Sequence, residues 1–145
     1  MKKIIIENFK HGSSTIEKLS VFVHDDDSLI LIPTFYSLYL YNNLRHYKQV
    51  DKKLKDGTNQ TQLVETDISD VTASLYISHL DRFLRYLYQS DQKNHAQNWL
   101  ALNHNLPSDI INYYINDFFI EQQKGSRGSA RQCVSALSSY YNYLT

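Results

Sequence analysis

The sequence predicts a mainly α-helical protein, α+β overall, in which a helical bundle follows a short β segment. A helical stripe runs through residues 70–89, where Tyr76, Leu80, Phe83 and Leu87 recur at the spacing of one helix face. β-branched residues gather instead near the beginning of the chain, in KKIIIENF and LSVFVH. We therefore expect strands only at the start and helices over most of the remainder.

Residues 1–45 are predicted to form an N-terminal appendage. Residues 2–9 and 19–24 read as antiparallel strands joined by the polar turn HGSST, and the three aspartates at 25–27 read as a solvated turn. Residues 29–32 could add a third short strand. Pro33 and Thr34 predict the start of a helix that reaches Leu44, because proline is tolerated in a first helical turn.

Residues 46–69 are predicted to form a polar, basic linker. The chain turns polar at RHYKQVDKKLKDGTNQTQ, and Asp56-Gly57 predicts a break in regular structure. Such a segment is most often only solvated, although its lysines could touch a polyanion.

Residues 70–145 are predicted to form a bundle of four helices, at about 70–89, 94–104, 109–123 and from 129 onward. Ser108 and Ser129 are the predicted caps of the last two helices. The final helix has an apolar face and a slim polar face with little bulk, which lets a partner approach closely. The apolar face comprises Ala130, Cys133, Leu137, Tyr140, Tyr141 and Leu144, and the slim face comprises Arg131, Ser135, Ser138 and Asn142.

Composition excludes several classes of protein. Fifteen basic residues balance fifteen acidic ones, so any claim of nucleic-acid binding must rest on the local distribution of charge. The single Cys133 excludes an intrachain disulfide. The first ten residues contain only three consecutive isoleucines, too few for a signal peptide. The apolar run from Leu29 to Tyr41 is short and broken by Pro33, so it cannot span a bilayer. We expect a cytoplasmic protein with no membrane partner.

The sequence offers no active site. It has no glycine-rich phosphate loop, and its six histidines show no metal-ligand spacing on one helix. His95 and His104, nine residues apart around Trp99, are weak metal candidates. We therefore predict no catalytic residue, no metal, no cofactor and no small-molecule substrate.

From Val71 onward, the order of features resembles the core-binding domain of tyrosine recombinases, the phage integrase group. The residues that carry it are Thr72, Tyr76, Leu80 and Phe83 in VTASLYISHLDRFLRYL, then LPSDIINYYINDFFIEQQKGSRG, then Ala136, Leu137, Tyr140 and Tyr141 in SARQCVSALSSYYNYL.

The resemblance implies a SAM-like bundle of four helices that clamps duplex DNA for integration or recombination. In that family the catalytic residues lie in a C-terminal domain, which would begin after Thr145, so none is carried onto this chain. The chain alone is then not an enzyme, and the parent protein would be a recombinase with a tyrosine nucleophile that self-assembles on DNA.

Local charge agrees with this expectation at specific residues. Lys124, Arg127 and Arg131 gather around the start of the final helix, where free N–H groups also favour a phosphate. The predicted DNA-binding residues are Arg82, Arg85, Lys124, Arg127, Ser129, Arg131 and Gln132; Gln132 and Asn142 could read base edges.

Two alternatives stay open. Residues 71–145 hold six basic and five acidic side chains, so the arginines could belong to an ordinary solvated surface. The chain could also be a helical protein-interaction module, or a regulatory DNA-binding protein without recombinase activity.

Overall fold

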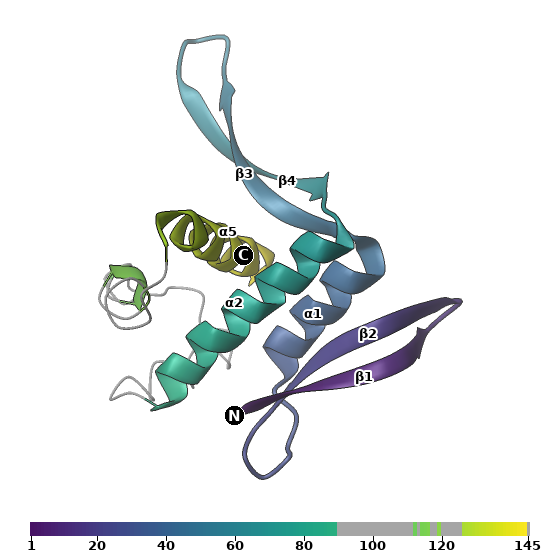
Figure 1. Ribbon diagram of the computed structural model, residues 1–145. Helices are drawn as coiled ribbons and strands as arrows, with labels where there is room; N and C mark the ends of the chain where they lie inside the picture. Colours follow the sequence, from purple (N-terminus) through teal and green to yellow (C-terminus); the bar gives the residue numbers. More distant parts are fainter. Residues whose placement is uncertain (90–111, 113, 117–118, 120–125, 145) are drawn as a thin grey trace.

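A computed structural model describes residues 1–89, 112, 114–116, 119 and 126–144 (Figure 1). Its elements in chain order are β1 (Lys2–His11), β2 (Ser14–Val23), α1 (Leu31–Asn43), β3 (Arg45–Lys53), β4 (Asn59–Asp67), α2 (Asp70–Gln89) and α5 (Arg127–Leu144). The predicted helix at 94–104 lies outside the described residues, as does most of the one at 109–123.

The described residues form an α+β fold, so the predicted mainly α, four-helix architecture is wrong. Strands take about 35% of them and helices about 49%, and the strands form two separate antiparallel hairpins, β1–β2 and β3–β4. The discrepancy comes from residues 46–69, where a β-hairpin stands in place of the predicted linker.

The β3–β4 hairpin turns at the same Asp-Gly pair that was interpreted as a linker breaker. Gly57 has a φ of 87°, a conformation that glycine adopts without strain, and Asp56 accepts hydrogen bonds from the amide and hydroxyl of Thr58. An Asp-Gly pair between strands is a hairpin signal. The flanking sequence conceals it, because most of the hairpin is exposed and lacks the apolar alternation of a half-buried strand.

The first hairpin confirms the predicted strands and extends both, with Lys2 opposite Val23 and His11 opposite Ser14. The third strand expected at 29–32 is reduced to one bridge between Leu29 and Val23, because α1 already begins at Leu31. Thr34 holds this junction together: its hydroxyl donates to the Ile30 carbonyl at 2.7 Å and accepts from the Phe22 amide at 3.1 Å.

Helix α2 has the predicted bounds, and the Ser69 hydroxyl caps it by accepting the Thr72 amide at 3.1 Å. Helix α5 starts earlier than expected, and its cap is Ser126 rather than Ser129. The amide of Ser129 donates to the Ser126 hydroxyl at 3.0 Å, so Ser129 is the third residue of the helix and not its cap.

One buried cluster joins α1, α2 and α5, whose fully buried side chains include Tyr36, Leu80, Leu137 and Tyr140. The rings of Tyr36 and Tyr140 meet edge to face at 5.1 Å. Side chains from residues 1–45 and from residues 70–145 thus share one core. The predicted division into an appendage, a linker and a helical domain that fold as separate units stays a prediction. Among the described residues, no helix combines the length and apolar content that crossing a bilayer requires.

Candidate nucleic-acid interface

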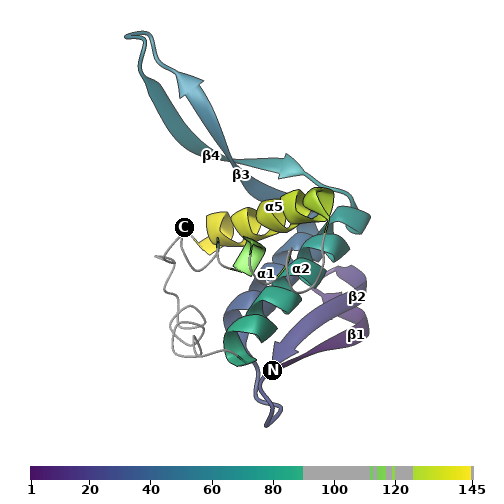
Figure 2. The ribbon, with the colours of Figure 1, turned by 60° about the vertical axis from the view of Figure 1, so that its left-hand side comes forward.

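The β3–β4 hairpin projects from the body, and only its root contacts the helices (Figures 1 and 2). Helix α1 passes directly into β3 at Leu44, whose left-handed conformation (φ 49°) turns the chain. The Ile68 amide donates to the Leu44 carbonyl at 2.9 Å and closes the root from the β4 side. The hairpin root is therefore held next to the outer face of α5.

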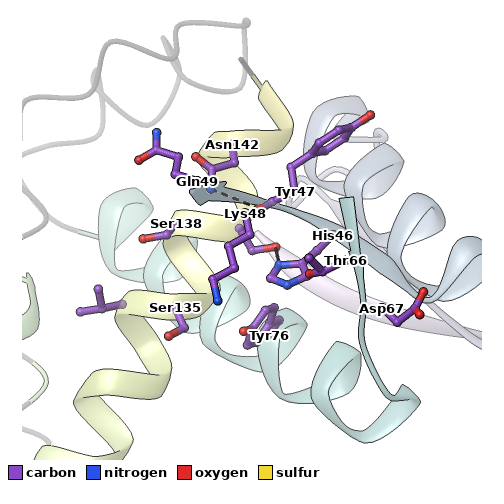
Figure 3. A pocket seen from close by; sticks show the side chains of 12 residues that line it. His46, Tyr47, Lys48, Gln49, Thr66, Asp67, Tyr76, Ser135, Ser138 and Asn142 are labelled. Atoms are coloured by element: carbon purple, nitrogen blue, oxygen red, sulfur yellow. Dashed lines mark hydrogen bonds between the residues drawn. The ribbon is translucent and has the colours of Figure 1, made fainter. Parts of the chain in front are cut away.

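Between the root and α5 lies a groove of about 560 Å³ (Figure 3). Lys48 reaches into it from β3 toward Ser135 on α5, and Tyr76 of α2 contributes to its floor. The remaining lining residues are His46, Tyr47, Gln49, Thr66, Asp67, Val134, Ser138, Ser139 and Asn142. The slim serine face predicted from the sequence thus forms one wall of a groove.

A buried hydroxyl ties three elements together beneath this groove. Tyr36 of α1 donates to the Ser139 hydroxyl at 2.8 Å, and Ser139, which is 1% exposed, lies 3.1 Å from Nδ1 of His46. Burial lowers the pKa of His46, and the nearby Lys48 lowers it further, which favours the neutral ring. The Ser139 hydroxyl therefore bridges two elements: it accepts from Tyr36 and lies within hydrogen-bond distance of Nδ1 of the His46 ring.

Contacts on the other side of the root fix the hairpin as well. Asn142 of α5 donates to the Tyr47 carbonyl at 3.2 Å. The ring of Tyr47 stacks on Tyr39 of α1 at 5.7 Å, and the Tyr39 hydroxyl donates to Glu65 at 2.6 Å. Both faces of the root are thus held, so the hairpin has a defined direction relative to α5.

The carboxylates of the two strands are confined to one face of the hairpin. Strand residues alternate in direction, and paired residues share a face. The face that includes His46 carries Lys48, Val50 and Lys52 on β3, opposite Val64, Gln62 and Gln60 on β4, and no carboxylate. The other face carries Asp51, Glu65 and Asp67 together with Arg45 and Lys53. Asp67 borders the groove, but Arg45 Nε lies 3.6 Å from its carboxylate.

A second cavity of about 510 Å³ continues the surface along α5. Arg127, Arg131, Ile115, Asn116, Ala130, Val134 and Ser135 line it, and Val134 and Ser135 also line the first cavity. Helix α5 contains no acidic residue. We call the surface that runs from Lys48 across Ser135 to Arg131 and Arg127 the cationic groove.

The structure brings together only part of the residue set predicted to contact DNA. Arg127 and Arg131 are exposed in the cationic groove. Arg82 is exposed on α2, whereas Arg85 pairs with Asp81 at 2.9 Å. Gln132 is exposed, and it partly offsets the burial that lowers the pKa of His79.

Arg82, Arg85, Ser129 and Gln132 line neither of the two cavities, and Lys124 lies outside the described residues. Sequence reasoning missed His46, and it treated Lys48 only as one of the linker lysines that could touch a polyanion, because the hairpin was interpreted as a linker. The Asp-Gly turn was the signal that could have revealed them.

No family model matches the chain, and neither a curated protein nor a solved structure gives a significant match. Within the described ranges, no group of three or more histidine, cysteine or acidic side chains could hold a metal ion.

Proposed function

We propose that the chain binds duplex DNA through the cationic groove. The observation that supports this proposal is a continuous surface with three exposed cations, Lys48, Arg127 and Arg131. Lys48 lies on the hairpin face that carries no carboxylate, and the two arginines lie on α5, which has no acidic residue. Asp67 at the border of the groove is paired with Arg45. Ion pairs between described residues engage Lys2, Arg45, Arg85 and the N-terminal ammonium instead. The three cations are therefore available to phosphates.

The shape of the groove also favours a phosphate backbone. Ser135 and Ser138 are small and exposed, so a strand of DNA can approach the helix while their hydroxyls donate to phosphate oxygens. The balanced total charge gives no long-range attraction, so affinity would come from these local contacts. Each neutralised phosphate adds about 0.9 to the salt slope, so three contacts correspond to a slope of about 2.7.

The wider role in integration or recombination rests only on the resemblance of residues 71–145 to the core-binding domain of tyrosine recombinases. We propose it as the context of DNA binding, with the catalytic tyrosine and self-assembly belonging to the parent protein. A regulatory DNA-binding protein would use the same groove.

The test is a titration of a labelled duplex by fluorescence anisotropy at several salt concentrations. We expect binding by the full chain at low salt. The variant Lys48→Ala/Arg127→Ala/Arg131→Ala should bind more weakly, with a salt slope lower by about 2.7. The matched control is Lys10→Ala/Lys18→Ala, which removes two exposed lysines from the β1–β2 hairpin; its salt slope should stay close to that of the unmodified chain.

Absence of binding at low salt would refute the proposal and favour a protein-interaction module. Losses in proportion to the charges removed, three in the test variant and two in the control, would show that binding follows total charge rather than the cationic groove.

A further inference from the structure

We propose that the distal half of the β3–β4 hairpin reads base edges in the major groove, with Gln60 and Gln62 as specificity-determining residues. The inference rests on the proposed DNA binding and adds sequence dependence to it. Its basis is the geometry of an exposed two-stranded ribbon, one face of which continues the cationic groove. We call this face, which includes His46, Lys48, Val50 and Lys52 and carries no carboxylate, the acid-free face.

The ribbon has the right dimensions for the major groove. Each strand has nine residues, which at about 3.3 Å per residue spans roughly 30 Å. The helices hold only the root, so the distal half extends beyond the body (Figure 2). The major groove of B-form DNA, about 12 Å wide, admits a two-stranded ribbon.

The side chains on the acid-free face suit the recognition of base edges. Gln62 lies opposite Val50, and Gln60 lies opposite Lys52 at the distal end. A glutamine amide can donate to and accept from adenine N6 and N7 at the same time, and a valine can contact the methyl group of thymine. Lys52 is available to a guanine edge or to a phosphate.

The opposite face of the ribbon is unsuited to the same role. Asp51, Glu65 and Asp67 would bring carboxylates toward phosphates, and Asp51 is already engaged by the Thr61 hydroxyl at 3.1 Å. Charge therefore selects which face approaches DNA. Double-stranded RNA is disfavoured because its major groove is deep and too narrow for protein side chains to read.

The experiment is a selection of bound sequences from a randomised duplex library with the full chain, followed by affinity measurements on enriched and random duplexes. We expect an enriched motif that contains adenine, bound about tenfold or more tightly than random DNA. The variant Gln60→Ala/Gln62→Ala should lose this preference while its affinity for random DNA changes by less than about threefold, because phosphate contacts remain.

The matched control is Asn59→Ala/Thr61→Ala, which removes two exposed polar side chains from the opposite face. It should enrich the same motif as the unmodified chain, and equal urea midpoints would establish that all three proteins are folded. Binding without any enriched motif, or a motif that survives Gln60→Ala/Gln62→Ala, would overturn base reading while leaving DNA binding intact. Equal affinity for an RNA duplex would also overturn insertion into the major groove. Absence of binding to every duplex would instead overturn the proposed function itself.

Discussion

Replacing Ser139 by alanine removes the hydroxyl that joins α1, α5 and β3. This oxygen lies 2.8 Å from the Tyr36 hydroxyl and 3.1 Å from His46 Nδ1, and the Tyr36 side chain is fully buried. A hydrogen bond contributes about 0.5–1.5 kcal/mol net, and leaving a buried hydroxyl without a partner costs about 1–3 kcal/mol. We expect Ser139→Ala to lower the free energy of unfolding by about 2–3 kcal/mol.

Tyr36→Phe should cost less, about 1 kcal/mol, because Ser139 keeps its contact with His46. The double variant Tyr36→Phe/Ser139→Ala leaves no unpaired hydroxyl at position 36. His46, which also loses its partner, is only half-buried and can reach water. The decrease in the free energy of unfolding should therefore be about 1 kcal/mol smaller in the double variant than the sum of the decreases in the two single variants.

Urea denaturation followed by far-UV circular dichroism measures these differences, provided that the slope of the transition is unchanged. Ser135→Ala is the matched control: this serine is exposed on the same helix and its loss should change stability by less than about 0.5 kcal/mol. Additive losses, or a neutral Ser139→Ala, would refute the reasoning that the buried hydroxyl holds the hairpin root to the helices.

Three further predictions concern the whole fold. Burial lowers the pKa of both His46 and His79, so the unfolded chain takes up protons first as the pH falls below about 6.5. The free energy of unfolding should then fall with pH until it levels off below the folded-state pKa values. An unchanged pH profile in His46→Gln/His79→Gln would contradict this. Burial raises the pKa of Cys133 to about 12, so iodoacetamide at pH 8 should label it only as the chain unfolds, and rapid labelling of folded protein would show an open core. Deleting residues 1–45 should abolish cooperative thermal unfolding, because Tyr36 and Leu40 fill the shared core; a cooperative remainder would support a separate appendage.

Several parts of the fold could be predicted because each has a local signal in the sequence, either a helical stripe of apolar residues or a gathering of β-branched residues. Helix α2 was predicted with its bounds because Tyr76, Leu80 and Phe83 recur at helical spacing. The β1–β2 hairpin was predicted because β-branched residues gather on both sides of a polar turn, and the structure buries Leu19 and Phe22 of β2. The amphipathic character of α5 was also predicted. Its start was misjudged because Ser126 and Ser129 are equally good caps in sequence.

The tertiary structure alone decided what the polar residues do. The distal β3–β4 hairpin buries little, so its sequence carries no apolar alternation, and backbone pairing rather than a hydrophobic face organises it. Ser135 and Ser138 read as solvent-facing, whereas the structure sets them across a groove from Lys48, about ninety residues earlier in the chain. The sequence by itself therefore determined which segments could bury an apolar face. Only the packing of the hairpin root against α1 and α5 decided which cations share one surface, because that neighbourhood joins residues distant in the chain.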